Sequence, residues 1–232
     1  MSLNGKVAIV TGGARRIGRG IVLTLAKQGA QVAFTYVSES SEAHAKALVR
    51  EVESLGSSAH AIKADAASLS SPKTVIECTL SAFNVDKLDI LFNNAGLESA
   101  GTRIEEVTAS ERLSLTRPGG RIVNLSSISA RGGFATKGTY SASKAAVEAL
   151  TRCWATELGH KYKVTVNAVN PGPVDTDMYR AAGETHFARM EEQNKKTPAA
   201  PRAGTENDVV EIIGFLCEER SRWITRDIIE GL

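Results

Sequence analysis

The chain has 232 residues, of which 42% are hydrophobic and 23% charged, and its formal net charge at pH 7 is +2. The length and composition are typical of one α/β domain with a substantial core, and a charge this close to zero gives no reason to expect nucleic acid or an anionic membrane as a partner. No apolar run approaches the ~20 residues of a membrane-spanning helix, and the amino-terminal segment lacks the basic and long apolar stretches of a signal peptide.

Short β-branched runs alternate with longer helical patterns along the chain. Six runs predict strands, at Lys6–Val10, Gln31–Tyr36, Ala59–Lys63, Leu88–Phe92, Arg121–Leu125 and Val164–Val169. Five segments predict helices, at Ile17–Gln28, Ser41–Ser54, Ser71–Phe83, Tyr140–His160 and Glu206–Cys217. Because the strands are apolar almost throughout and separated by helices, we expect a parallel sheet covered on both faces. The segment from Pro171 to Thr205 is predicted to be a long irregular loop, and such loops are often lids.

Ligands bind parallel sheets at the carboxyl ends of the strands, so the residues at those ends are the candidates for a site. After the first strand the sequence is TGGARRIG, at positions 11–18. Its glycines would let backbone N–H groups approach a pyrophosphate at the start of the next helix. The candidate cofactor-binding residues here are Gly12, Arg15, Arg16, Ile17 and Gly18.

The end of the second strand bears on which nucleotide would bind. The sequence there is FTYVSES, and positions 35–38 carry no acid that could accept hydrogen bonds from an adenosine ribose. Arg15 and Arg16 lie in the neighbouring loop, and a planar guanidinium suits a 2′-phosphate, so we predict a preference for NADPH with Ser38 among the contacts. The alternative is that both arginines are solvated loop charges, and Glu39 counts against a phosphate.

The later strands also end in small or polar residues. Asp65 follows the third strand and would accept from an adenine amino group or cap a turn. The fourth strand ends in NNAG, the fifth in Ser126-Ser127 and the sixth in NPGPVDT. The candidate cofactor-binding residues in these segments are Asn93, Ala95, Gly96, Pro171, Gly172, Val174 and Thr176.

The helical run GTYSASKAAVEAL, residues 138–150, carries a tyrosine and a lysine one turn apart. A free tyrosine has a pKa of ~10, and an ammonium one turn away would stabilise the phenolate and lower that pKa. Taken alone, Tyr140 and Lys144 would be an ordinary surface pair. With Ser127 thirteen residues upstream and the glycine loop in place, we favour a catalytic role for all three.

These motifs, in this order, resemble those of the short-chain dehydrogenase/reductase family over nearly the whole chain. The resemblance implies a Rossmann-like doubly wound parallel sheet in a single domain, residues 1–232. It implies NADP as cofactor and hydride transfer between NADPH and a ketone or secondary alcohol. Tyr140 would be the general acid, Lys144 would also hold the nicotinamide ribose, and Ser127 would polarise the carbonyl. Thr176 and the backbone near Val174 would hold the carboxamide.

The chain departs from the family pattern in three places. Arg16 stands where most members carry glycine, a form that resembles pteridine reductases, while the remaining motifs look more like 3-oxoacyl and polyhydroxynaphthalene ketone reductases. Between Gly96 and Gly119 the chain is roughly twenty residues short of the family, although a parallel crossover needs only about a dozen. The carboxyl-terminal WITRDIIEGL looks like a shortened ending, with a clipped seventh strand and Arg226 in place of glycine.

The shortened segment affects two expectations. In the family it carries an asparagine that completes a catalytic tetrad, and no asparagine lies between Asn94 and Asn124. It also packs against a partner subunit in the dimers and tetramers typical of the family. Residues 104–115 could still form a short helix. A non-catalytic NADP-binding member, or an inactive splice or gene-model variant, is therefore the alternative to an active reductase; the retained motifs count against a scaffold without nucleotide.

The cysteines indicate the compartment. Cys78, Cys153 and Cys217 are odd in number and far apart. This pattern argues against a disulfide framework and against a zinc site, and it favours a reducing, cytoplasmic location.

Overall fold

A computed structural model describes residues 1–231 except 67, 69, 96–117, 135–136 and 181–183. The strands are β1 (Val7–Val10), β2 (Gln31–Tyr36), β3 (Ala59–Lys63), β4 (Ile90–Asn93), β5 (Arg121–Leu125), β6 (Thr165–Pro171) and β7 (Ile228–Gly231). The helices are α1 (Arg16–Lys27), α2 (Glu39–Ser54), α3 (Ser71–Phe83), α4 (Ser129–Gly132), α5 (Gly138–Tyr162), α6 (Asp177–Arg180), α7 (Glu184–Asn194), α8 (Glu206–Cys217) and the short η2 (Glu219–Ser221). The Gly96 and 104–115 predictions lie outside the described residues.

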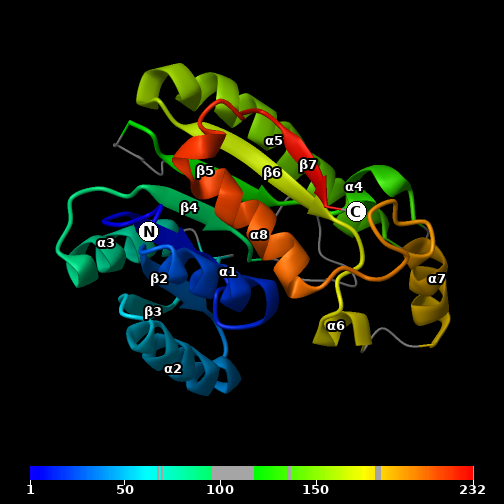
Figure 1. The fold of residues 1–232 in the computed structure, drawn as a ribbon, viewed down its shortest axis with the longest axis horizontal. Coiled ribbons are helices and arrows are strands. Elements are labelled where there is room, and N and C mark those ends of the chain that lie inside the picture. The colour runs from blue at the N-terminus through cyan, green and yellow to red at the C-terminus, as the bar shows by residue number, and fades with distance from the viewer. Residues whose placement is uncertain (67, 69, 96–117, 135–136, 181–183, 232) are drawn as a thin grey trace.

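All seven strands form one parallel sheet in the order β3-β2-β1-β4-β5-β6-β7 (Figure 1). From β1 the chain moves outward through β2 to β3, and from β4 it moves outward the other way to β7. The carboxyl ends of β1 and β4 therefore meet where the strand order reverses, which is where ligands bind in open α/β sheets. The predicted doubly wound parallel sheet is confirmed.

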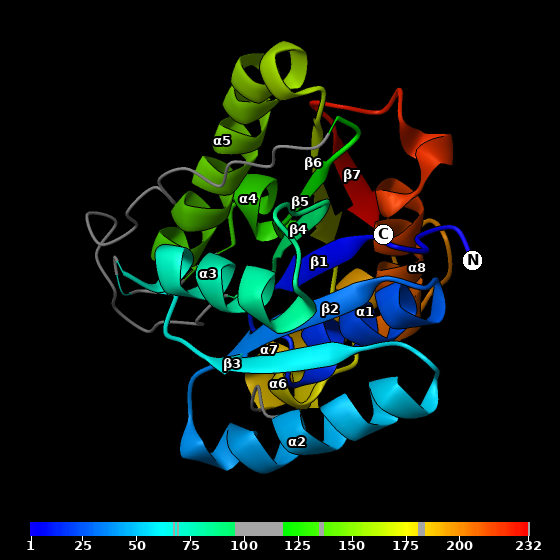
Figure 2. The ribbon, with the colours of Figure 1, turned by 90° about the vertical axis from the view of Figure 1, so that its left-hand side faces the viewer.

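Helices cover both faces of the sheet (Figure 2). On one face α1 packs between α2 and α8, and on the other α3 lies toward β3 while α5 lies over β5 and β6. Every residue of β1 and β6 is buried, as expected for strands covered from both sides. The apolar side chains of α1, Ile21, Val22 and Leu25, fill the core beneath that helix.

The amino end of α8 shows how local sequence sets a helix boundary. Thr205 Oγ1 accepts a hydrogen bond from the Asp208 backbone N–H at 3.2 Å, and Asp208 Oδ2 accepts from the Thr205 N–H at 2.7 Å. This reciprocal capping box satisfies N–H groups that the first helical turn leaves without partners. α8 begins and ends where the sequence predicts.

The prediction of an irregular loop from Pro171 to Thr205 was wrong. The segment contains α6 and α7, and the Tyr179 and Phe187 rings of these two helices meet edge to face with centroids 5.3 Å apart. Asn194 Nδ2 at the end of α7 donates to the Tyr179 hydroxyl at 2.8 Å. These helices are short and mostly polar, so their apolar periodicity is weak in the sequence and contacts between them hold them in place.

The remaining predicted boundaries shift by at most two residues, and those of β2, β3, β5 and α3 match the prediction. Strand β4 begins at Ile90 because the Asp89 carboxylate lies beside β1, where it accepts from the Val7 N–H and from Lys6 Nζ, both at 3.0 Å. Strand β6 extends to Pro171, which pairs with Gly231 of β7. Helix α5 is longer than predicted at both ends.

The carboxyl-terminal segment forms a full partner strand. Residues 228–231 pair with 168–171 in parallel register. Just before the strand, Arg226 has φ of 68°, a left-handed conformation that glycine adopts without strain, and its N–H donates to the Val166 carbonyl at 2.8 Å. The backbone conformation explains why glycine is usual at this position, and it shows that arginine still allows the strand to form.

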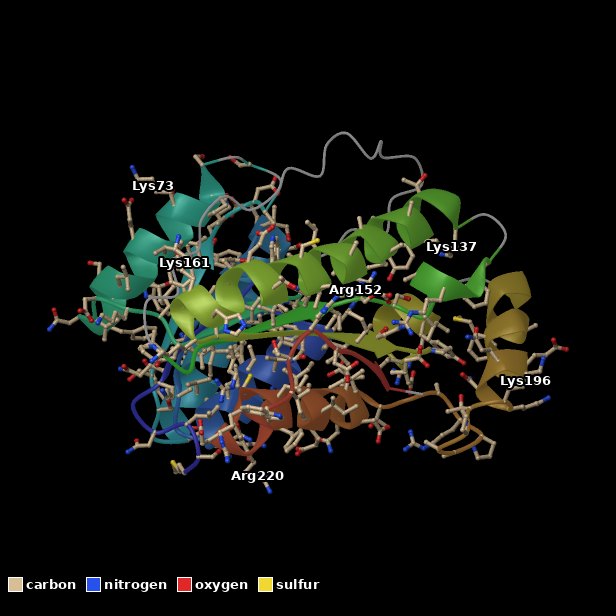
Figure 3. All side chains as sticks on the ribbon, turned by 90° about the horizontal axis from the view of Figure 1, so that it is seen from above. Lys73, Lys137, Arg152, Lys161, Lys196 and Arg220 are labelled. Atoms are coloured by element: carbon tan, nitrogen blue, oxygen red, sulfur yellow. The ribbon has the colours of Figure 1, made fainter. Side chains whose placement is uncertain are left out.

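Surface charge and membrane character agree with the bulk composition. The basic side chains labelled in Figure 3 are spread around the molecule, from Lys73 on α3 to Arg220 in η2. No helix in the described part of the chain combines the length and apolar character that a membrane crossing needs.

Candidate active site

Glycines allow the loop between β1 and α1 to pack closely against the first turn of α1. Gly12 has φ of 64°, and its N–H donates to Thr35 Oγ1 of β2 at 2.9 Å. A Cβ on Gly18 would lie 2.2 Å from the Gly12 carbonyl oxygen and 2.7 Å from Asn94 Nδ2, so only glycine fits there. The first turn of α1 therefore lies directly against the loop, and a helix begins there at the carboxyl edge of the sheet, the arrangement that binds anions in other α/β folds.

Arg15 and Arg16 flank this loop on the side of β2. Arg15 Nη2 donates to Ser40 Oγ at 3.2 Å, and the Ser38 hydroxyl lies 2.9 Å from that same oxygen. Arg15 Nε is buried and has no hydrogen-bond partner within the described part of the chain. A guanidinium, two hydroxyls and the amino end of α2 thus meet in one place, a set of groups that suits a phosphate.

Glu39 does not compete for this position. Its carboxylate pairs with Lys63 at the end of β3. Arg16 has φ of 53°, so the position where the family favours glycine is a left-handed one, and a non-glycine residue there costs about 1–2 kcal/mol.

The segment after β4 braces the glycine loop. Asn94 Nδ2 donates to the carbonyls of Thr11 and Gly12 at 2.9 and 3.0 Å, and the backbone N–H groups of Asn94 and Ala95 both donate to Thr11 Oγ1 at 3.0 Å. Asn93 lies one residue earlier, and its amide donates to Asn124 Oδ1 of β5 at 2.8 Å. The brace by Thr11 and Asn94 was missed in the sequence, where two adjacent asparagines give no sign of which one faces the loop.

The three predicted catalytic residues lie at the ends of β5 and α5. Lys144 Nζ is 5.8 Å from the centroid of the Tyr140 ring and donates to the Leu125 carbonyl of β5 at 2.8 Å. Ser127 follows two residues later, and its Oγ accepts from the Ser129 N–H at 3.2 Å. Because that N–H occupies an acceptor site of the hydroxyl, the Ser127 proton is available to a neighbouring carbonyl oxygen.

The segment after β6 lies beside the candidate site at the carboxyl edge of the sheet. Val174 forms a parallel bridge with Gly204, and the Pro171 and Gly172 backbones are bonded to Ile128 and Gly231. Thr176 caps the start of α6, where its Oγ1 accepts from the Tyr179 N–H at 3.4 Å. Asp65, at the end of β3, is exposed, and its carbonyl accepts from the Ser68 N–H at 3.0 Å.

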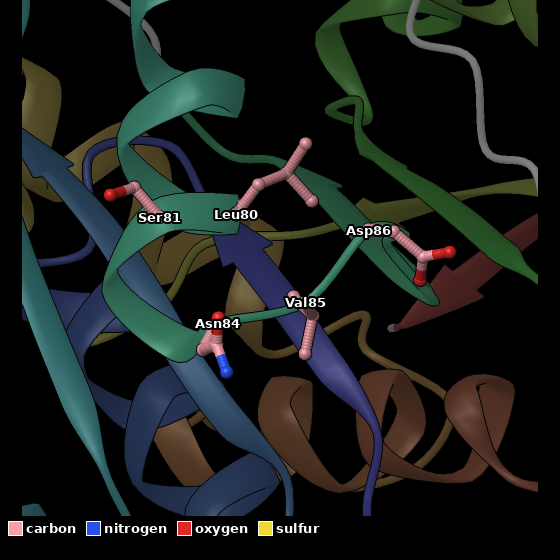
Figure 4. Close-up of a pocket in the computed structure, with 5 residues that line it drawn as sticks. All are labelled: Leu80, Ser81, Asn84, Val85 and Asp86. Atoms are coloured by element: carbon pink, nitrogen blue, oxygen red, sulfur yellow. The ribbon is translucent and has the colours of Figure 1, made fainter.

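A pocket of about 590 Å³ lies elsewhere, between the end of α3 and the start of β4 (Figure 4). Its lining residues are Leu80, Ser81, Asn84, Val85 and Asp86. This is the amino edge of the sheet, and the pocket contains none of the predicted site residues. The predicted site residues lie instead around the opposite, carboxyl edge of the sheet. Within the described residues no cluster of histidine, cysteine and acidic side chains suits a metal ion.

Comparisons with known proteins give matches over nearly the whole chain. A family profile described as enoyl-(acyl carrier protein) reductase matches residues 12–230. The short-chain dehydrogenase/reductase FrzI of Cladobotryum sp is 40% identical over 250 residues, covering 99% of this chain and 95% of FrzI. The chain belongs to the short-chain dehydrogenase/reductase family.

Other members of this dehydrogenase/reductase family are similarly close. The hydroxynaphthalene reductase-like protein Arp2 of Metarhizium robertsii is 37% identical over 255 residues, covering 98% of this chain and 94% of Arp2. A blue fluorescent protein from a metagenomic library, solved in complex with NADPH, has a TM-score of 0.86 and 38% identity over 99% of this chain and 97% of its own. A short-chain dehydrogenase from Burkholderia cenocepacia J2315, in complex with NADP, has a TM-score of 0.83 and 34% identity over 99% of this chain and 97% of its own.

The alignment with FrzI spans 250 residues, more than the 232 of this chain. FrzI therefore has residues without a counterpart here, in agreement with the shortening expected from the sequence.

The pKa of Lys144 differs from that of an ordinary lysine. Burial lowers its pKa to about 8, because the charged form loses hydration. Between that pH and the ordinary value of 10.5 the unfolded chain binds the proton and the folded chain does not. The Lys144 contribution to the free energy of unfolding therefore rises as pH increases across this window and is flat below it.

We expect the Lys144 methyl signal of a reductively methylated, ¹³C-labelled sample to titrate with a midpoint near pH 8. The Lys144→Arg variant, in which this signal is absent, assigns it to Lys144. A Lys144 midpoint above pH 10 would show that the ammonium is as hydrated as a surface lysine.

Proposed function

We propose that this protein is an NADPH-dependent oxidoreductase that transfers a hydride between the nicotinamide cofactor and a ketone or secondary alcohol. The observation that carries the proposal is that Lys144, beside the Tyr140 ring, donates to the Leu125 carbonyl two residues before Ser127, at the same sheet edge as the braced glycine loop. Family membership and the NADPH-bound and NADP-bound structures of relatives support it. The hydride is supplied by the cofactor; the protein holds, orients and exchanges protons around it.

Each side chain would have a distinct task in carbonyl reduction. Ser127 donates a hydrogen bond to the substrate carbonyl, and Tyr140 transfers its phenolic proton to the same oxygen as it gains negative charge. Lys144, still mostly protonated at neutral pH, stabilises the resulting phenolate one helical turn away. This division of roles requires no residue from the segment 96–117.

The remaining residues would bind the cofactor. The glycine loop, with Gly12, Ile17 and Gly18, would face the pyrophosphate, and Arg15, Arg16 and Ser38 the 2′-phosphate. Asp65, Asn93, Ala95 and Gly96 would line the adenosine side, as the family motifs imply. Pro171, Gly172, Val174 and Thr176 would face the nicotinamide, whose ribose contacts Tyr140 and Lys144. The unpartnered Arg15 Nε and the crowded Gly12 and Gly18 positions fit such a ligand.

The cofactor preference is the first property to measure. In titrations followed by nicotinamide fluorescence, we expect NADPH to bind at least tenfold more tightly than NADH. Arg15→Ala is expected to weaken NADPH binding by about 10- to 100-fold, since a hydrogen bond to a charged group contributes roughly 1.5–3 kcal/mol, and to leave NADH binding unchanged. Arg16→Gly would act in the same direction while relieving backbone strain.

The matched control is Arg19→Ala. Arg19 is exposed on α1 and pairs with Glu51 of α2 at 2.5 Å, away from the glycine loop. It should leave both affinities unchanged. Equal binding of NADPH and NADH by the unaltered chain would remove the role assigned to the arginines.

A second function is a non-catalytic NADP-binding protein, which the shortened segment 96–117 favours. The two functions are separated by supplying NADPH with reactive α-diketones and o-quinones, a choice guided by the hydroxynaphthalene reductase-like relatives. NADPH oxidation that depends on the carbonyl compound supports the reductase. Tight NADPH binding without turnover on any of these compounds supports the second function.

The cysteines bear on the location of the protein, and the family resemblance bears on its assembly. We infer a cytoplasmic protein, supported by three cysteines that are all free thiols, with the pKa of Cys217 raised to about 12 by burial. The family resemblance implies a homodimer or homotetramer with a small-molecule carbonyl substrate. Sedimentation velocity decides whether the chain with its shortened interface segment still assembles.

A further inference from the structure

A buried carboxylate lies one helical turn beyond Lys144. Tyr140, Lys144 and Glu148 occupy positions i, i+4 and i+8 of α5, so they share one face of the helix. Glu148 is 4% exposed. A buried carboxylate is costly unless hydrogen bonds and a charge partner satisfy it, so its contacts show what it holds in place.

Three segments of the candidate site converge on this carboxylate. Oε1 accepts from the Ser126 hydroxyl at 3.0 Å and is 3.4 Å from the donating Nδ2 of Asn170. Oε2 accepts from Arg131 Nε at 3.0 Å. The partners come from the end of β5, the end of β6 and helix α4, while the carboxylate itself belongs to α5.

These contacts bracket Ser127. Ser126 is the residue immediately before it, and its N–H is bonded to the Val169 carbonyl at 2.8 Å. Arg131 lies four residues after it, on the short helix whose Ser129 N–H orients the Ser127 hydroxyl. Movement of either flank would therefore change the position of that hydroxyl.

Arg131 also reaches the last strand. Its Nη1 donates to Glu230 Oε1 of β7 at 2.5 Å, so one guanidinium joins a buried and an exposed carboxylate. The hydrogen bond to Glu148 is the largest cause that raises the pKa of Arg131. A helix of four residues has little stability of its own, and this pair of bonds ties α4 to α5 and to the sheet edge.

We propose that Glu148 is a positioning residue that, through Ser126 and Arg131, fixes the Ser127 hydroxyl against Tyr140 and Lys144. The role rests on the proposed reductase function, and Glu148 acts through Ser126 and Arg131 rather than on the reacting atoms. A buried ion pair contributes little net stability compared with apolar packing, which leaves the alignment of the site as the reason for this one.

The test is a double-mutant cycle on kcat, with 9,10-phenanthrenequinone as the carbonyl probe and saturating NADPH. Glu148→Gln is expected to lower kcat by about 10- to 100-fold, since a misplacement of about 1 Å costs roughly that much, while KM for NADPH stays near the wild-type value. In a Ser127→Ala background the same change should lower kcat by less than threefold, because the hydroxyl that Glu148 positions is already gone. Glu148→Asp, which keeps the charge, should recover part of the loss.

The control is Glu157→Gln, an exposed acid on the same helix, which should leave kcat unchanged. If Glu148→Gln does not fold, Arg131→Gln tests the same link from an exposed side chain. Equal losses from Glu148→Gln with and without Ser127 would overturn the positioning role and leave a structural one.

Hydrogen exchange separates this inference from the proposed function. Peptides covering residues 126–132 should exchange faster in Glu148→Gln than in the wild type. The exchange rates of glycine-loop peptides should be the same in these two proteins. In Glu157→Gln, peptides covering residues 126–132 should exchange at the wild-type rate. Unaltered exchange in 126–132 would overturn the inference even if the wild-type chain reduces no carbonyl. A wild-type chain that reduces no carbonyl but shows the expected exchange would overturn only the reductase assignment.

Discussion

Replacement of Tyr140 by phenylalanine is expected to lower kcat for carbonyl reduction by about 10²–10⁴-fold, the usual contribution of a general acid. The ring stays in place beside Lys144, whose Nζ lies 5.8 Å from the ring centroid, and only the proton donor is lost. NADPH binding should change less than threefold, because most of the predicted cofactor contacts come from the strand ends rather than from α5. Stopped-flow measurement of NADPH oxidation with saturating diketone gives the rate.

The matched control for this change is Tyr162→Phe. Tyr162 lies at the far end of α5, where its ring lies beside Lys161 Nζ and packs against the core. It should leave kcat unchanged. A Tyr140→Phe enzyme with near-normal kcat would mean that another group, or water, supplies the proton, and Tyr140 would then be a structural residue.

Replacement of Gly18 by alanine is expected to abolish measurable NADPH binding. The added Cβ would lie 2.2 Å from the Gly12 carbonyl oxygen and 2.7 Å from Asn94 Nδ2. Neither the loop backbone nor the Asn94 brace can yield without opening the glycine loop, so we expect the free energy of unfolding to fall by about 1–3 kcal/mol, as for other overpacked sites. Urea denaturation and a fluorescence titration with NADPH measure the two effects.

Gly159→Ala is the control for the backbone chemistry of this change. Gly159 lies inside α5, and a Cβ there would meet only the Val164 carbonyl at 3.7 Å, an ordinary contact. Alanine should raise the free energy of unfolding by about 0.5–1 kcal/mol, because the unfolded chain loses freedom. Tight NADPH binding by Gly18→Ala would show that the loop does not contact the cofactor backbone as proposed.

The tolerance of this chain to its departures from the family has a physical basis. The segment 96–117 is short, yet β4 and β5 pair in parallel along residues 90–93 and 121–124, so the strands meet despite the shorter connection. Arg226 and Arg16 both adopt left-handed backbone conformations that favour glycine. Each costs some stability, and the paired strands and packed helices on either side hold these conformations.

Parts of the site were beyond the reach of sequence patterns. A glutamate eight residues after Tyr140 looks like one more solvated charge on a helix, and only the packing of α5 against β5 and β6 buries Glu148 beside Ser126 and Arg131. The Asn94 brace depends on the register between β1 and β4, which places Thr11 and Gly12 beside it. Helices α6 and α7 depend on contacts between Tyr179, Phe187 and Asn194.

The sequence by itself determined the class of fold and the position of each strand end, because apolar runs of strand length separated by helical patterns have one economical arrangement, a parallel sheet covered on both faces. It also determined which residue types stand at those ends. Tertiary structure alone decided which of these side chains face one another, since the hydrogen bonds among Asn94, Glu148, Arg131 and their partners join residues 17 to 99 positions apart. Such contacts depend on strand register and helix rotation, and local sequence patterns do not encode either of them.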